Sequence, residues 1–347
     1  MSDPVVVKLG SSLIVDARGR ARRTVLRARS AEIAALVRAG TPVCVVSSGA
    51  IALGLPRLGL DRRPRSLPKL QAASALGQAR LQRVWERALA DEGVEAAQIL
   101  LTAGDIADRA AYVNARNALR ALFALRAVPI VNENDATATD EITFGDNDAL
   151  AAQVAVLVRA RLLVLLTEVE GVFTRAPGTP GAELVGEGSL AREAVLADAS
   201  ALGRGGMQSK VLAAEMAAAA GIPSVIADGA ADSVLAPIVA GEPRGTRFSA
   251  SAQPLSAYKL WLRFGKPAAA RLHVDEGARR AVAADAKSLL AVGVVSCEGS
   301  FEAGDAVELV APGGAVFAKG IAGAGRAEIE RRPRGLEAVH RDRLVVY

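Results

Sequence analysis

The sequence is poor in several residues on which catalytic and structural sites often depend. Its 347 residues include two cysteines and two histidines, and aromatic side chains make up only 3%. Cys44 and Cys297 stand far apart and indicate neither a disulfide framework nor a zinc site, so we expect a reducing compartment, the cytoplasm. The scarcity of histidine disfavours chemistry in which a histidine acts as the base.

Signals for a membrane or for secretion are also missing. The chain does not start with a basic segment followed by an apolar one, so no signal peptide is expected. Arg159 and Arg161 interrupt the longest apolar run, 149–166, and we therefore expect no membrane span. The net charge of +5 is too small to indicate nucleic-acid binding by itself.

Aliphatic residues are abundant, with 51% of the chain hydrophobic, and such a core suits helices packed on a parallel sheet. The sequence predicts six strands at 4–10, 42–48, 96–101, 128–133, 161–167 and 222–227, and most of them are continuous apolar runs that fit strands buried on both faces. Helical patterns alternate with them at 24–39, 70–91, 112–126, 148–160, 207–220 and 231–240. This alternation predicts an α/β fold, a three-layer αβα sandwich with a mostly parallel sheet.

Other segments interrupt this pattern. The basic, proline-rich segment 56–69 is interpreted as a solvated connector in preference to a binding loop. The excursion 168–206 is long enough to suggest a functional hairpin or flap. A junction around 241–257 precedes short strand signals, starting with "KLWLRFG" (259–265), that predict a small, mostly-β barrel. The predicted division is a domain at 1–250, a linker at 251–258 and a second domain at 259–347.

Common nucleotide-binding motifs are absent. The chain has no G-x-x-x-x-G-K-[ST] and no G-x-G-x-x-G between its first strand and helix. The segment "GRGGMQSK" (203–210) precedes a helix, and its backbone N–H groups could hold phosphates. A purely structural glycine loop is at least as compatible with this pattern.

Polar residues follow several predicted strands, where ligands of open α/β sheets bind. They include Lys8 in "VVVKLGSS", Ser48 in "VVSSGA" and Asp148 in "GDND". Each alone has a structural explanation, as a strand-end lysine or a helix cap. Lys8 and Lys210 together fit phosphoryl transfer, which needs positive charge and Mg²⁺ around the transferred group. A nearby acid would keep both lysines charged.

These motifs resemble the amino acid kinase family and, within it, the glutamate 5-kinases. The resemblance extends over most of 1–250 and is carried by "VVVKLGSS", "VVSSGAIALG", "VPIVNENDATAT", "FGDNDALAA" and "GRGGMQSK". It implies ATP-dependent phosphorylation of the γ-carboxylate of L-glutamate to L-glutamyl 5-phosphate, the first step of proline biosynthesis, with Mg²⁺, in the cytoplasm. A homo-oligomer, dimer or tetramer, is implied too. The segments "SLLAVGVVSCEGSFEAGDAV" and "VHRDRLVVY" resemble a PUA domain.

The resemblance also implies roles for individual residues. Lys8, Asp148 and Lys210 would be catalytic, and Ser48, Asp135 and Asn147 would bind glutamate. ATP would be bound by Lys8, Thr167, Glu168, Arg204, Gly205, Gly206, Met207, Gln208, Ser209 and Lys210. No metal ligand is assigned. Glu168 and Arg204 stand where the family usually has an aspartate and a threonine. These two differences affect the expected contacts with the nucleotide and not the expected reaction.

Two kinds of alternative stay open. Acetylglutamate kinase, aspartokinase or a nucleoside monophosphate kinase would share the fold, although "SGAIALG" and the C-terminal module disfavour them. An RNA-binding or regulatory protein with an inactive kinase-like domain is the alternative from another class. The presence of Lys8, Asp148 and Lys210 disfavours it, and RNA binding by the PUA-like module is the less favoured expectation.

A carboxylate acceptor is already ionised at pH 7, so no general base is required.

Overall fold

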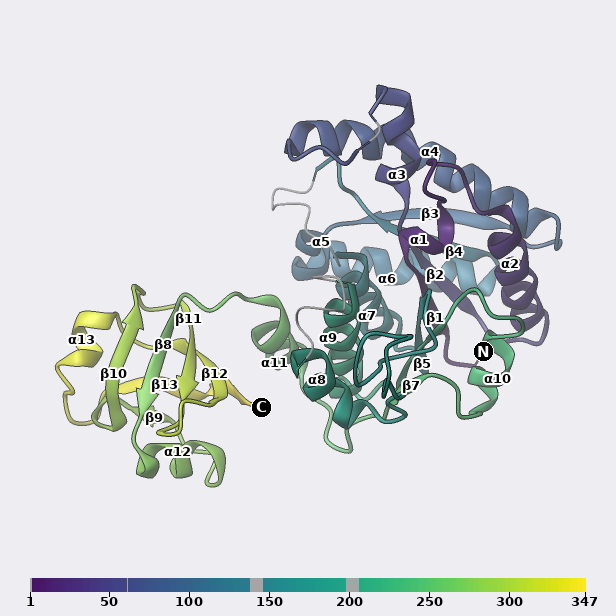
Figure 1. Cartoon of the computed structure of the whole chain (residues 1–347). Coiled ribbons are helices and arrows are strands. Elements are labelled where there is room, and N and C mark those ends of the chain that lie inside the picture. The colour runs from purple at the N-terminus through teal and green to yellow at the C-terminus, as the bar shows by residue number, and fades with distance from the viewer. Residues whose placement is uncertain (1, 61, 138–145, 198–205) are drawn as a thin grey trace. The chain divides into compact units, whose positions relative to one another are not determined.

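The structure is a computed structural model that describes residues 2–60, 62–137, 146–197 and 206–347. The chain divides into two compact units, Met1–Pro254 and Leu255–Tyr347 (Figure 1). The finer boundaries expected from the sequence, 1–250, 251–258 and 259–347, stay a prediction. None of the described helices is long and apolar enough to cross a membrane.

A seven-stranded sheet forms the centre of the N-terminal unit, in the order β3-β4-β2-β1-β5-β6-β7. Six strands are parallel, and β7 runs antiparallel to β6. The strands are β1 (Val5–Leu9), β2 (Val43–Ser47), β3 (Ala96–Leu101), β4 (Val128–Glu133), β5 (Leu162–Thr167), β6 (Ser224–Asp228) and β7 (Thr246–Phe248). All six predicted strands are present. Five of them are buried, as apolar runs suit strands that are covered on both faces, but the edge strand β3 is half-buried or exposed except at Leu101.

Helices cover both faces of this sheet, which confirms the three-layer architecture. Successive residues of β1 point to opposite faces, so Val7 and Val6 belong to different hydrophobic clusters. One face carries α1 (Ser11–Ile14), α2 (Arg23–Arg38), α3 (Ala50–Gly54), α4 (Leu67–Ala90) and α10 (Leu235–Ala240). The other carries α6 (Arg109–Ala124), α7 (Asp146–Val158), α8 (Gly188–Ala197) and α9 (Gly206–Ala219). The remaining helical elements are η1 (Leu55–Leu58) and α5 (Ala103–Ala107).

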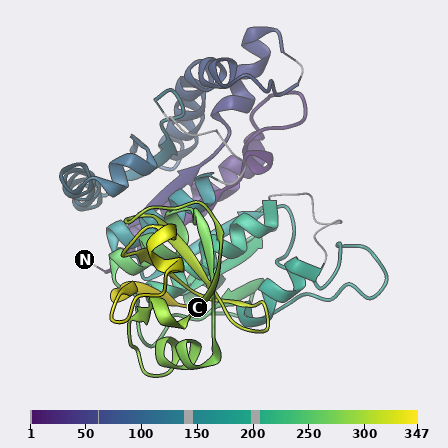
Figure 2. The same cartoon turned by 90° about the vertical axis from the view of Figure 1, so that its left-hand side faces the viewer.

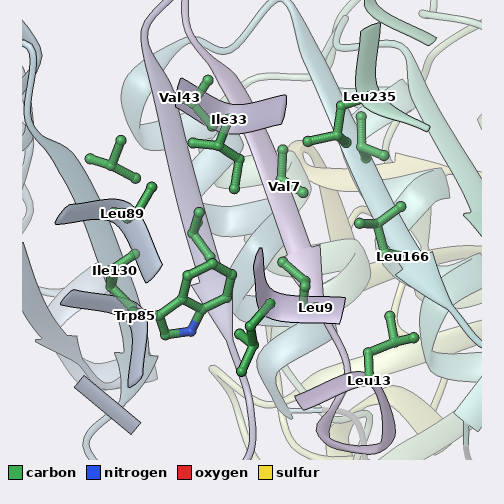
Figure 3. Close-up of a cluster of buried hydrophobic side chains, with 14 of the residues drawn as sticks. Val7, Leu9, Leu13, Ile33, Val43, Trp85, Leu89, Ile130, Leu166 and Leu235 are labelled. Atoms are coloured by element: carbon green, nitrogen blue, oxygen red, sulfur yellow. The ribbon is translucent and has the colours of Figure 1, made fainter. Parts of the chain in front are cut away.

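In the hydrophobic cluster that contains Val7, the largest side chain is Trp85 of α4, which is fully buried against the sheet (Figure 3). Its indole Nε1 donates a hydrogen bond to Ser47 Oγ, at a distance of 2.9 Å. Because the polar edge of the ring is satisfied, the apolar rest can be buried at no hydrogen-bonding cost. The contact attaches α4 to the carboxyl end of β2.

Helices α3 and α4 approach each other so closely that only glycine fits between them. A Cβ atom on Gly54 would lie 1.8 Å from the carbonyl oxygen of Ala73, and one on Gly77 would lie 1.8 Å from that of Ala50. This contact holds the turn between β2 and α3 against α4.

Some elements of the N-terminal unit were not indicated by the sequence patterns, among them β7 and α8. Strand β7 lies within the expected junction 241–257; it is short, and Thr246 and Phe248 are buried on either side of an exposed Arg247. The excursion 168–206 has an antiparallel bridge between Phe173 and Leu184, as a hairpin would, but it also contains helix α8.

The C-terminal unit is built on a six-stranded sheet in the order β10-β8-β11-β12-β13-β9. The green and yellow strands form a curled sheet (Figure 2), in agreement with the predicted mostly-β barrel. Most of the buried hydrophobic side chains of this unit belong to one cluster. The strands are β8 (Ala270–Val274), β9 (Leu289–Leu290), β10 (Val294–Gly299), β11 (Ala306–Val310), β12 (Val316–Ala322) and β13 (Glu337–Val346). The helical elements are α11 (Ala257–Leu260), η2 (Trp261–Gly265), α12 (Glu276–Ala283), η3 (Ala291–Gly293) and α13 (Arg326–Glu330).

The strand expected at 259–265 is wrong, because this segment is helical in α11 and η2. Apolar residues at alternate positions, Leu260, Leu262 and Phe264, imitate the period of a strand. The Oγ of Ser256 accepts a hydrogen bond from Lys259 N and caps the first turn. The cap and the burial of Leu260 and Leu262 favour the helix.

Candidate active site

A polar pocket of about 390 Å³ lies at the carboxyl ends of β1, β2 and β4. This is the edge at which open α/β sheets bind ligands, and the volume is typical of small-molecule sites, roughly 300–1,000 Å³. Its lining comprises Lys8, Gly10, Ser11, Ser12, Ser48, Gly49, Ala50, Ile51, Ala52, Leu55, Arg63, Asn132, Glu133, Asp135, Asn147, Asp148, Gly206, Ser209 and Lys210.

One carboxylate in this pocket contacts two lysines. Lys8 Nζ lies 2.5 Å from Asp148 Oδ1, and Lys210 Nζ lies 3.3 Å from Asp148 Oδ2. All three side chains are buried, and they come from β1, α7 and α9. The three residues predicted to be catalytic are therefore neighbours in the folded chain.

Helix α9 presents further polar groups to the same carboxylate. Ser209 Oγ donates a hydrogen bond to Asp148 Oδ2 over 2.7 Å. Lys210 Nζ also donates to the carbonyl oxygen of Gly206, in the first turn of the helix, at 3.0 Å. Both oxygens of Asp148 are thus engaged by the protein.

Charge and burial act against each other at this cluster. Burial by itself would raise the pKa of Asp148, but the nearby Lys8 and Lys210 outweigh it, and the pKa lies below the usual value. Burial lowers the pKa of Lys8, as does the charge of Lys210, while Asp148 opposes both. Asp148 is therefore held ionised, as a counter-charge for the lysines.

The residues predicted to bind the acceptor line the same pocket. The amide of Ser48 donates to Leu9 O over 3.1 Å, and the next residue, Gly49, has a φ of +112° that favours glycine. This sharp turn places Ser48 directly after the carboxyl end of β2, where it lines the pocket. Asn147 Oδ1 accepts a hydrogen bond from the amide of Glu133 at 3.4 Å.

Asp135 is a second buried carboxylate of the lining. Its Oδ2 accepts a hydrogen bond from Ser74 Oγ at 2.6 Å. Burial raises the pKa of Asp135, while the hydrogen bond from Ser74 and the charge of Arg63 oppose the rise. A buried carboxylate of this kind gains stability from a cationic ligand.

Only some of the residues predicted to bind ATP line this pocket. Thr167 ends β5, and its carbonyl oxygen accepts a bond from Gly229 N at 2.7 Å, while Glu168 Oε1 lies 3.0 Å from the guanidinium of Arg22. Of the predicted set in α9, Gly206, Ser209 and Lys210 line the pocket, Gln208 is exposed, and the side chain of Met207 packs in the core. Arg204 and Gly205 lie outside the described residues.

Several lining residues were not selected from the sequence, among them the polar side chains of Arg63, Asn132 and Glu133. Arg63 belongs to the segment that was interpreted as a solvated connector, and no motif distinguishes it from Arg62 and Arg65 beside it. Asn132 lies in "VPIVNENDATAT", so its place at the end of a strand could have indicated it. It is buried, and its Nδ2 donates to Gln78 Oε1 at 2.7 Å.

Comparison with known proteins identifies the families of both parts of the chain. Residues 3–228 match the sequence profile of the amino acid kinase family. The chain belongs to the amino acid kinase family. Residues 270–342 match the PUA domain, so a PUA domain follows the kinase domain.

Relatives of this amino acid kinase match it over its whole length. It is 43% identical to a protein named glutamate 5-kinase from Burkholderia cenocepacia (strain HI2424), over 99% of this chain and 98% of that protein. It is 44% identical, with the same coverage, to one of the same name from Burkholderia mallei (strain SAVP1). Among solved structures, the UMP kinase from Bacillus anthracis is 17% identical with a TM-score of 0.50, over 72% of this chain and 97% of that one. This last likeness concerns the fold alone.

Proposed function

We propose that this amino acid kinase transfers the γ-phosphoryl group of ATP to the γ-carboxylate of L-glutamate and forms L-glutamyl 5-phosphate, the first step of proline biosynthesis. The observation that carries the proposal is the single carboxylate of Asp148 between the ammonium groups of Lys8 and Lys210. The full-length relatives named glutamate 5-kinase support the choice of acceptor.

The reaction needs charge neutralisation more than proton transfer. A γ-carboxylate oxygen attacks the γ-phosphorus, the bond from phosphorus to the β–γ bridging oxygen breaks, and ADP leaves. Both reactants are anions, and Lys8 and Lys210 would reduce their repulsion and stabilise the charge on the transferred group. Asp148 would provide the counter-charge for the two ammonium groups and hold them in position.

Mg²⁺ is the cofactor implied for such a kinase. Among the described residues, no group of three or more His, Cys, Asp or Glu side chains could hold a metal ion. The oxygens of Asp148 are occupied by Lys8, Lys210 and Ser209, so this carboxylate does not fit as a ligand. Mg²⁺ often depends on the substrate phosphates for binding, and we infer that it enters with ATP, whose phosphate charge it would neutralise.

The other residues in the pocket would bind the two substrates. Ser48, Asp135 and Asn147 would hold glutamate, with Asp135 accepting the α-ammonium group. The proposed ATP site comprises Lys8, Thr167, Glu168, Gly206, Met207, Gln208, Ser209 and Lys210, with Arg204 and Gly205 outside the described residues. Because the side chain of Met207 is in the core, only its backbone could contact the nucleotide.

The proposal is tested by incubating the purified protein with ATP, Mg²⁺, L-glutamate and hydroxylamine. Glutamyl 5-phosphate would be trapped as the γ-hydroxamate, and ADP should form in step with it. N-acetyl-L-glutamate, L-aspartate and UMP serve as competing acceptors. Turnover with one of these and none with glutamate would overturn the proposal.

The assembly and the PUA domain call for separate measurements. We propose a homo-oligomer, dimer or tetramer, which light scattering during gel filtration would detect. RNA binding is the less favoured alternative for the PUA domain. A gel-shift titration at several salt concentrations tests it, since attraction by general charge alone weakens steeply with salt.

A further inference from the structure

The charges on the pocket lining divide into two groups. Six charged side chains among the described residues line it, namely Lys8, Lys210, Asp148, Arg63, Glu133 and Asp135. The first three form the connected cluster that would act on the phosphoryl group. The second group therefore contains two carboxylates and one guanidinium.

Glutamate, the proposed acceptor, has an ammonium group and a second carboxylate that this second group of charges would have to bind. When the γ-carboxylate of glutamate is directed at Lys8 and Lys210, its α-ammonium and α-carboxylate groups are at the other end of the molecule. The ammonium matches Asp135, but the α-carboxylate would be repelled by Asp135 and Glu133. It requires a cation, and Arg63 is the cation that the described lining has besides the two lysines.

We propose that Arg63 binds the α-carboxylate of the acceptor and so selects an α-amino acid over other compounds with a carboxylate. The inference rests on the proposed function, since it assumes that the γ-carboxylate faces the lysines. A guanidinium suits this role because it can form two parallel hydrogen bonds with one carboxylate. Asp135 and Arg63 would then recognise the two charged groups of the amino acid head.

The position of Arg63 supports this role. It lies between η1 and α4, and both Arg63 and Leu55, the first residue of η1, line the pocket. The charge of Arg63 lowers the pKa of Asp135 against the effect of burial, which places the two side chains within electrostatic reach. Arg63 is exposed, so it can meet a substrate arriving from solvent.

A competing arrangement leaves Arg63 without a role. The α-carboxylate would instead be held by Ser48 and the backbone amides that follow it. Steady-state kinetics distinguish the two arrangements, with L-glutamate compared to L-isoglutamine, in which a carboxamide replaces the α-carboxylate. Isoglutamine is measured as an acceptor and as a competitive inhibitor of glutamate.

The variants are Arg63→Ala and Arg63→Lys, with Arg65→Ala as the matched control, because Arg65 is an exposed neighbour that does not line the pocket. Losing a hydrogen-bonded charge partner should raise KM for glutamate in Arg63→Ala by about tenfold to a hundredfold. The kcat, the KM for ATP and the constants for isoglutamine should stay within about twofold of wild type, and Arg63→Lys should recover part of the loss. Arg65→Ala should behave as wild type.

The inference is overturned if KM for glutamate is unchanged in Arg63→Ala, or if isoglutamine weakens by the same factor as glutamate. Thermal unfolding of each variant checks that the fold is intact. A wild-type protein that does not phosphorylate glutamate overturns the proposed function itself. Turnover of glutamate by wild type with an unchanged KM in Arg63→Ala overturns only the role of Arg63.

Discussion

Lys8 Nζ and Asp148 Oδ1 are 2.5 Å apart, and this contact joins the first strand of the sheet to helix α7. The other oxygen of Asp148 accepts hydrogen bonds from Lys210 and Ser209 of α9. One buried carboxylate therefore positions two cations from different elements. Its removal should affect both folding and catalysis, whereas removal of one lysine should affect mainly catalysis.

Lys210→Ala is expected to lower turnover by at least about a hundredfold, as for the loss of other groups that stabilise transition-state charge. The protein should stay folded, because Asp148 keeps its contacts with Lys8 and Ser209. The hydroxamate assay at saturating substrates measures the effect, and Lys69→Ala, an exposed change on α4, is the control. Unchanged turnover would show that Lys210 does not act on the phosphoryl group.

Asp148→Asn is expected to destabilise the folded state at pH 7 by about 3–5 kcal/mol, because two buried ammonium groups lose their counter-charge. The pKa of Asp148 is lowered in the folded state, by Lys8 and Lys210 against the effect of burial. Its stabilisation is therefore present above the unfolded pKa, about 3.9, and is lost as the pH falls through the lower folded value.

Urea unfolding at several pH values checks this expectation. Between pH 7 and pH 4 the wild type and Asp148→Asn should differ by a nearly constant free energy. The difference should shrink as the pH falls further, since protonation of Asp148 in the wild type has the same effect as the substitution. A difference that grows on acidification would contradict the assigned sign.

Gly77→Ala should destabilise the N-terminal unit, because the added Cβ would lie 1.8 Å from the carbonyl oxygen of Ala50 and must push α3 away from α4. Overpacking of this kind typically costs about 1–3 kcal/mol. Since α3 follows Ser48 and Gly49, KM for glutamate should rise as well. Gly104→Ala is the matched helical control, as its Cβ would meet only an ordinary contact at 3.5 Å. Equal unfolding midpoints for the two variants would refute the close contact.

Much of the N-terminal fold could be predicted, because strands buried on both faces need continuous apolar runs. The residues of β1 illustrate this: all five are buried, Lys8 included. The polar residues that follow these strands could be recognised for the same reason, since parallel strands end at one edge of the sheet. The family motifs then indicated that Lys8, Asp148 and Lys210 take part in the same phosphoryl transfer.

Other features could not be predicted because local patterns do not determine them. The alternation of Leu260, Leu262 and Phe264 resembles a strand, and the cap by Ser256 with burial in the C-terminal unit makes it a helix. Strand β7 is three residues long and exists through its pairing with β6. Arg63 looks like any arginine of a basic loop until the chain brings it to the pocket.

The sequence by itself determined the alternating strands and helices, the polar residues after the strands and the family to which the chain belongs. The tertiary structure decided which of these residues act together. Asp148 meets Lys8 and Lys210 because β1 lies in the middle of the sheet and α7 and α9 pack on the same face of it. Such contacts join segments that are remote in the chain, so they arise from packing and from no local preference.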